Sequence, residues 1–246
     1  MSTPQLPVGF ALPAGFDSVT YATLHQRFAS FATGPQAQVW RVFAAAWNGI
    51  AYRLRSADEQ RRILGASLRR SAAPPPDERY TQEQALFVFF GSAASALECF
   101  YLASYCAANL LDPTTFPIDK AGHLNKYAPE IAKEFVHLRG TEAISVALSA
   151  HVASAWWTQL FDLRNVLTHR GSLPRLHFVS NVPGHDRPSA VPRNPKALSG
   201  AWQYEFAMTD VAIDSLYTEV EGALNALLRA LLAFHDRQLR AERSAG

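Results

Sequence analysis

Apolar residues recur at helical spacing along most of this chain, whereas the polar/apolar alternation of a half-buried strand is rare. This pattern predicts a mainly α-helical protein. Of its 246 residues, 48% are hydrophobic, which is enough for the helices to bury a sizeable core. The expected helices have these approximate bounds: 17–31, 35–70 with a possible break, 81–111, 126–138, 141–170 and 210–243.

Two short segments near the C-terminal end depart from the helical pattern. LPRLHFV (173–179) and WQYEFAM (202–208) alternate polar and apolar residues, so we expect two strands that form a hairpin before the last long helix. Proline-rich connectors are expected at 71–80 and 181–200.

The connectors are the strongest breaks in the pattern, and neither is a convincing domain boundary. We therefore expect a single domain over residues 1–246. Within it, residues 1–70 form an N-terminal helical extension and residues 81–243 form a bundle that includes the hairpin and loop of 173–209.

The segment ALFVFFGSAASALECFYLASYCAANLL (85–111) contains one charged residue, Glu98, and has the length of a membrane span. Serines and an asparagine are spread along it, and no second such segment follows. These features favour a central bundle helix buried by its neighbours. Glu98 then is either a buried hydrogen-bonded group or a residue that orients a basic partner on a neighbouring helix.

The cysteines and the N-terminal residues indicate a reducing compartment. Cys99 and Cys106 are seven residues apart in one helix, roughly 10 Å along its axis, too far for a disulfide. The N-terminal residues lack a charged region followed by an apolar stretch, so no signal peptide is expected. We therefore expect a cytoplasmic protein. Its net charge of +2 neither favours nor excludes nucleic acid as a partner.

The sequence FDLRNVLTHRG (161–171) places three polar residues on the last turns of an expected helix. At about 100° per residue, Asn165 lies opposite the apolar stripe, His169 about 130° from it, and Arg164 at its border. We expect the three to point out of the core and to converge on one ligand. The stripe itself should be buried; it consists of Leu148, Val152, Trp156, Leu160, Leu163 and Leu167.

Two aromatic residues, Trp157 and Phe161, fall on the same outward face as the polar residues. Side chains this large and apolar are rarely left in water without a partner surface. We therefore expect them to form the interface of a homodimer.

The residues RNVLTH (164–169) fit the Arg-polar-x3-His signature of HEPN (higher eukaryotes and prokaryotes nucleotide-binding) domains, which this chain resembles. More loosely, the resemblance extends to FFGSAASALECFYLASY (89–105) and to the strand pair before the final helix. It implies an antiparallel helical bundle that dimerises with two motifs facing each other across a cleft. Many such proteins are metal-independent endoribonucleases of toxin–antitoxin or antiviral systems, and others only bind nucleotides or proteins. In a subset, a tyrosine two residues after the histidine is modified, but here Gly171 stands there.

These residue types suit cleavage of single-stranded RNA by its own 2′-hydroxyl. His169 can transfer protons near neutral pH, and Arg164 offers planar donors to phosphate oxygens. Asn165 can fix the histidine tautomer or hold a phosphate oxygen. Arg170 and Arg175 would steer the RNA backbone, and Glu98 would support Arg164. We expect RNA, a second copy of the chain and an antitoxin or activator as partners, and no cofactor or metal.

Each feature also has a structural interpretation. His169 and Arg170 could stabilise the helix end by charge alone, and Asp162 is expected to pair with an arginine. His177 and His185 are eight residues apart across an expected strand and loop, which is not a metal-ligand spacing. The alternatives to the enzyme are a non-catalytic HEPN module that binds nucleotides or proteins, and a structural helical scaffold.

Overall fold

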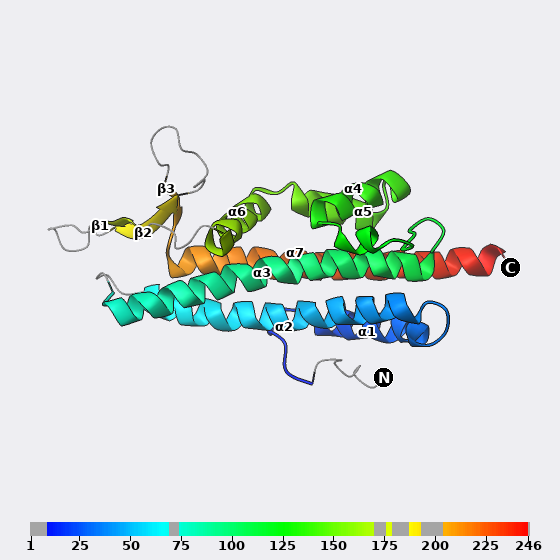
Figure 1. Ribbon diagram of the computed structural model, residues 1–246, viewed down its shortest axis with the longest axis horizontal. Coiled ribbons are helices and arrows are strands. Elements are labelled where there is room, and N and C mark those ends of the chain that lie inside the picture. The colour runs from blue at the N-terminus through cyan, green and yellow to red at the C-terminus, as the bar shows by residue number, and fades with distance from the viewer. Residues whose placement is uncertain (1–8, 69–73, 170–175, 179–186, 193–203, 246) are drawn as a thin grey trace. The chain divides into compact units, whose positions relative to one another are not determined.

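The computed structural model describes residues 9–68, 74–169, 176–178, 187–192 and 204–245, and these are mainly α-helical, as predicted. The α-helices are α1 (Ser18–Phe28), α2 (Ala37–Leu68), α3 (Pro76–Leu111), α4 (Ala128–Arg139), α5 (Ala143–Val152), α6 (Ala155–His169) and α7 (Asp210–Ala245) (Figure 1). Short 3-10 helices are η1 (Ala29–Ala32) and η2 (Ala121–Asn125), and the strands are β1 (Leu176–Phe178), β2 (Arg187–Pro192) and β3 (Tyr204–Ala207).

The chain divides into two compact units, each built from separate stretches of sequence. Unit 1 comprises residues 1–54, 95–154 and 221–246, and unit 2 comprises residues 55–94 and 155–220. Helices α2, α3 and α7 contribute residues to both units. The expectation of a single domain over residues 1–246 stays a prediction.

Stacked aromatic rings join α1 to α2 in unit 1. The rings of Tyr21 and Trp47 are stacked, with centroids 5.0 Å apart, and the ring of Phe43 also stacks with the indole at 5.1 Å. The Tyr21 hydroxyl donates a hydrogen bond of 2.9 Å to the Trp47 carbonyl. Because all three side chains are fully buried, this contact removes a large apolar area from water.

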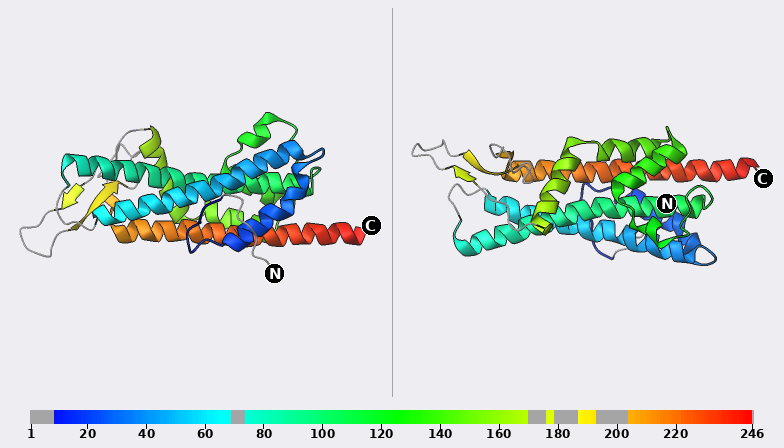
Figure 2. Two further views of the ribbon diagram at one scale, coloured as in Figure 1. Left: turned by 90° about the horizontal axis from the view of Figure 1, so that it is seen from below. Right: turned by 45° about the horizontal axis from the view of Figure 1, so that its top comes forward.

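Helices α4 and α5 pack on each other in unit 1 (Figure 2). Phe135 of α4 contacts Phe116 at 5.0 Å and Phe234 of α7 at 6.2 Å between ring centroids. The Tyr101 hydroxyl of α3 donates a 2.7 Å hydrogen bond to the Leu148 carbonyl of α5. This bond fixes α5 against α3, and burial raises the pKa of Tyr101, so the phenol stays protonated.

Among the described residues, one helix, α3, is long and apolar enough to cross a membrane by length and composition. Within its most apolar window, 56% of the residues are buried inside the chain.

Helix α3 starts earlier than expected: it begins at Pro76, inside the expected connector. Proline suits the first helical turn, and Asp77 and Glu78 there favour the helix dipole.

In unit 2, a buried carboxylate is compensated by two arginines. Asp58 of α2 is 5% exposed and accepts hydrogen bonds from Arg61, at 2.7 Å, and from Arg62. Arg61 also donates to Asp214 of α7 at 2.6 Å, and its guanidinium lies over the Tyr217 ring. This network ties α2 to α7, and both oxygens of the Asp58 carboxylate accept from an arginine.

The strands of unit 2 do not form the expected hairpin. They pair in the antiparallel order β1-β2-β3, so the two expected strands are separated by β2, which lies in the expected connector 181–200. The register shifts between Val191 and Pro192, where proline lacks the N–H that a ladder bond needs. Alternation alone did not reveal β2, because prolines occur in its short sequence RPSAVP.

The Tyr101 hydrogen bond predicts a measurable contribution to stability. Tyr101→Phe keeps the ring and removes only the hydroxyl, so we expect the free energy of unfolding to fall by about 1 kcal/mol. Tyr80→Phe is the matched control, because the Tyr80 side chain is 70% exposed. Urea denaturation of the three proteins measures the effect, and equal midpoints would show that the Tyr101 bond contributes nothing.

Candidate functional site

The polar motif lies on α6, which is a separate helix. The expected continuous helix over 141–170 is wrong, because α5 ends at Val152 and α6 begins at Ala155. The Ser154 hydroxyl donates a 2.7 Å hydrogen bond back to the His151 carbonyl, and the Ala153 N–H bonds to the Ser149 carbonyl at 3.2 Å. These bonds close the last turn of α5, and α6 begins as a separate helix at Ala155.

The break changes which tryptophan is buried. Trp157, expected on the outward face, is only 5% exposed, whereas Trp156, expected in the core, is half-buried. Because α6 begins at Ala155, Trp156 lies in its first turn, while Trp157 precedes Leu160 and Leu163 at helical spacing. Trp157 therefore belongs to the apolar face, and its expected outward orientation is wrong.

Phe161, the other residue assigned to that interface, is half-buried. Its ring stacks on Trp157 with centroids 4.4 Å apart and an interplanar angle of 21°. Phe161 thus has a partner within the chain, and this contact accounts for an aromatic residue at this position.

Arg164 and Asn165 are brought together on α6, and both are half-buried. The Arg164 Nη1 donates a 2.9 Å hydrogen bond to the Asn165 Oδ1. One turn later, the Thr168 hydroxyl donates to the Arg164 carbonyl at 2.7 Å. The amide of Asn165 therefore restricts the orientation of the guanidinium.

His169 is the last residue of α6, and its side chain lies outside the described residues. Arg170 and Arg175 also lie outside them, so their contact with RNA stays a prediction. Glu98 is half-buried on α3 in unit 1, whereas the motif belongs to unit 2. The expected support of Arg164 by Glu98 likewise stays a prediction.

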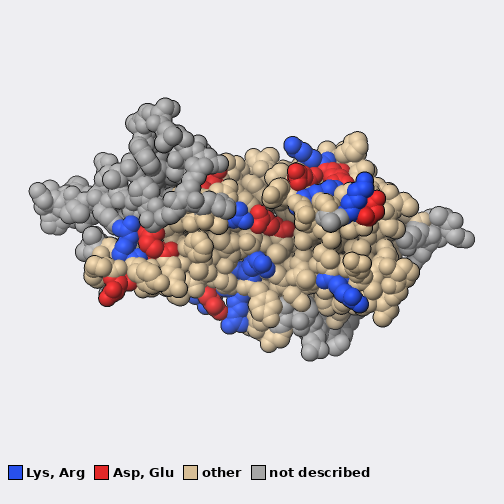
Figure 3. Space-filling view, viewed as in Figure 1, with Lys and Arg blue, Asp and Glu red and all other residues tan. Residues whose placement is uncertain are grey.

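The described residues contain no group of three or more His, Cys, Asp or Glu placed to hold a metal ion. On the face drawn in Figure 3, described basic and acidic side chains are interspersed, without one large patch of either sign. Any attraction for a polyanion must therefore be local on that face.

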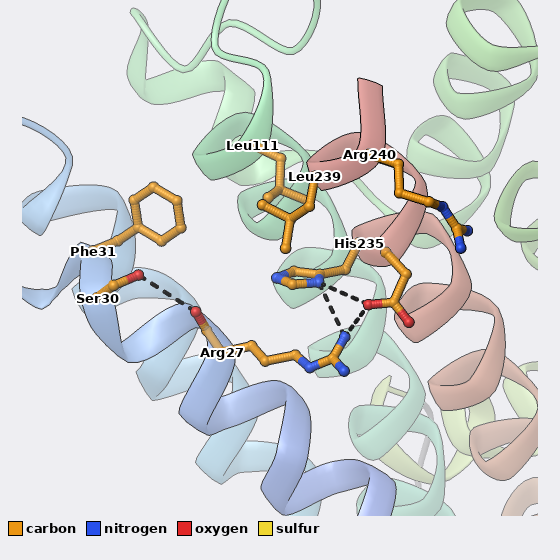
Figure 4. A pocket seen from close by; sticks show the side chains of 8 residues that line it. Arg27, Ser30, Phe31, Leu111, His235, Leu239 and Arg240 are labelled. Carbon is orange, nitrogen blue, oxygen red and sulfur yellow. Dashed lines mark hydrogen bonds and ion pairs between the residues drawn. The ribbon is translucent and has the colours of Figure 1, made fainter. Parts of the chain in front are cut away.

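Sequence reasoning missed a pocket of unit 1, with a volume of about 540 Å³. It is lined by α1, η1, α3 and α7 through Arg27, Ser30, Phe31, Leu111, His235, Asp236, Leu239 and Arg240 (Figure 4). His235 is 4% exposed, and its Nδ1 lies 3.3 Å from Arg27 Nη1 and 3.5 Å from Asp236 Oδ1. A histidine next to Phe234 in an apolar helical pattern was the available signal.

An ion pair between Arg27 and Asp236 forms one wall of this pocket. Burial acts to raise the pKa of Asp236, but the hydrogen bond and charge of Arg27, together with His235, outweigh it and lower the pKa. Asp236 is therefore ionised at neutral pH and holds the arginine in place.

Comparisons of this chain with protein-family models, with curated proteins and with solved structures find no match.

The burial of Trp157 predicts a stability effect that a surface residue would not have. Trp157→Ala should lower the free energy of unfolding by about 3 to 5 kcal/mol, because it opens a cavity in the apolar face of α6. Trp156→Ala, one residue earlier, removes a half-buried ring and should have a clearly smaller effect. Thermal denaturation with sedimentation checks both. An unchanged stability with a loss of dimer would return Trp157 to a subunit interface.

Proposed function

We propose that this protein is a metal-independent HEPN-type endoribonuclease that cleaves single-stranded RNA. The observation that carries the proposal is the Arg164–Asn165 pair: two polar residues, half-buried and hydrogen-bonded to each other, on the last two turns of α6. His169 follows four residues after Asn165 and completes the Arg-polar-x3-His signature on the same helix.

In the proposed reaction, the 2′-oxygen of a nucleotide attacks the adjacent phosphorus, and the bond from phosphorus to the 5′-oxygen breaks. His169 removes the 2′-hydroxyl proton or delivers a proton to the leaving oxygen. Arg164 binds the phosphate oxygens on which charge builds up, because its planar donors match them and remain charged at any working pH. Asn165 positions Arg164, as its hydrogen bond indicates.

The proposal includes a homodimer, because one motif contains one histidine and the reaction uses both an acid and a base. Two motifs across a two-fold axis would supply the second histidine. With Trp157 buried, the interface would be formed by other residues. We further propose a cytoplasmic toxin or antiviral effector, controlled by an antitoxin or an activating protein, with the arrangement of helices and strands of a HEPN domain.

The chemistry predicts a distinctive product. Cleavage of single-stranded RNA should persist in EDTA and leave 2′,3′-cyclic phosphate ends, whereas DNA should remain intact. RNA with a 2′-O-methyl group at the cut site lacks the nucleophile and should resist cleavage there. Gel analysis with end-group mapping gives the result. Cleavage at the methylated position would exclude this mechanism, and binding without cleavage between pH 5 and 9 would support the non-catalytic HEPN module.

Substitutions in the motif should separate activity from stability. Arg164→Lys keeps the positive charge that suits a helix C-terminus but loses the planar donors, so we expect a folded protein whose cleavage rate falls at least about 100-fold. His169→Ala should have a similar effect on the rate, with a loss of stability below about 1 kcal/mol.

The matched controls lie on other helices. Arg41→Lys changes an exposed arginine of α2, and His137→Ala removes an exposed histidine in the last turn of α4. Both should cleave RNA at the wild-type rate. Cleavage rates and melting temperatures of all four variants decide the matter, and a wild-type rate for either motif variant would show that RNVLTH does not carry the activity.

A further inference from the structure

Phe161 lies next to the Arg164–Asn165 pair on α6, and its side chain is half-buried. Residues three and four apart on a helix are surface neighbours, with Cβ atoms roughly 5 to 6 Å apart, so Phe161 adjoins both polar residues. All three belong to unit 2. A molecule that contacts the polar pair is therefore within reach of the Phe161 ring.

A buried partner holds the Phe161 ring in place. The ring stacks on Trp157, with centroids 4.4 Å apart and an interplanar angle of 21°, so one of its faces is covered. Trp157 is itself only 5% exposed. The exposed part of Phe161 then lies on the edge of the ring or on its other face. A ring held in this way loses little entropy when a planar group stacks on it.

A nucleotide combines the two groups that suit this surface. Its phosphate carries the negative charge that an arginine binds, and its base is a planar π-system that stacks on aromatic side chains. One sugar separates the base from the phosphate, so the two can contact neighbouring residues on one helix face. The bases of an RNA duplex are already paired and stacked, so an unpaired base is the one that can stack on a side chain.

We propose that Phe161 is a substrate-binding residue on which an unpaired RNA base next to the scissile phosphate stacks. This inference rests on the proposed ribonuclease function, in which Arg164 binds that phosphate. It adds a preference for the base beside the cut: a purine, with its larger ring surface, should be favoured over a pyrimidine. Trp157 orders the ring, and the base uses the surface that Trp157 leaves uncovered.

The direct test compares two single-stranded 2′-O-methyl oligonucleotides, an adenine homopolymer and its abasic counterpart, which the proposed reaction cannot cleave. In fluorescence anisotropy, the wild-type full chain should bind the adenine oligonucleotide at least about fivefold more tightly, because base–aromatic stacking contributes that much. Phe161→Leu keeps an apolar side chain next to Trp157 but removes the aromatic face, so most of this preference should be lost. Phe161→Tyr keeps the ring and should retain the preference.

Phe87→Leu is the matched control, because it makes the same change at a side chain that is 48% exposed on another helix of unit 2. It should keep the wild-type preference. Equal binding of the two oligonucleotides by the wild type, or a wild-type preference in Phe161→Leu, would overturn the proposal. Sedimentation tests the other use of an exposed ring: loss of a dimer in Phe161→Leu, with the base preference unchanged, would assign Phe161 to a subunit interface instead.

Cleavage of ordinary RNA is a separate readout, so the two proposals can fail separately. If the wild type cleaves RNA and Phe161→Leu keeps the base preference, the assignment of Phe161 fails and the ribonuclease function stands. If the wild type cleaves no RNA but loses its base preference in Phe161→Leu, the ribonuclease function fails and the base-binding role of Phe161 stands.

Discussion

Burial of the apolar side chains of α3 is the constraint on which the rest of the structure depends. In unit 1, Phe100, Tyr101 and Tyr105 are fully buried, and in unit 2, Phe89 and Phe90 are. Such a helix needs neighbours on several sides, because hydrophobic burial is the dominant favourable term in folding. The other helices of each unit supply those neighbours, so their polar residues are left for the outer faces, where a site can form.

The break between α5 and α6 shows how a local bond overrides a long-range pattern. Periodicity across 141–170 is continuous, since Leu148, Leu160 and Leu163 fall on one stripe of an unbroken helix. The hydrogen bond of Ser154 to the His151 carbonyl ends α5 nevertheless. The spacing of apolar residues shows which face of a helix is apolar, so the helix content was predictable. It does not show where a side-chain hydrogen bond ends a helix, so the burial of Trp157 was not predictable.

The candidate sites differ in how far the sequence could reveal them. Arg164 and Asn165 are adjacent on one helix, so they were expected together from the sequence, and a 2.9 Å hydrogen bond joins their side chains. Arg27 and His235 are 208 positions apart and meet only because α1 packs against α7. No spacing rule applies at that separation. Similarly, β2 is recognisable only from its pairing with β1 and β3.

Asn165 is the residue that best separates a functional motif from a helix end stabilised by charge. An arginine near a helix C-terminus is favourable to the dipole whatever it binds, so Arg164 alone does not discriminate. Asparagine carries no charge for the dipole and is a weaker helix former than alanine or leucine. Its half-buried side chain accepts a hydrogen bond from the guanidinium of its neighbour. Stabilising the helix end by charge does not account for that bond, whereas the proposed role of orienting Arg164 toward a phosphate does.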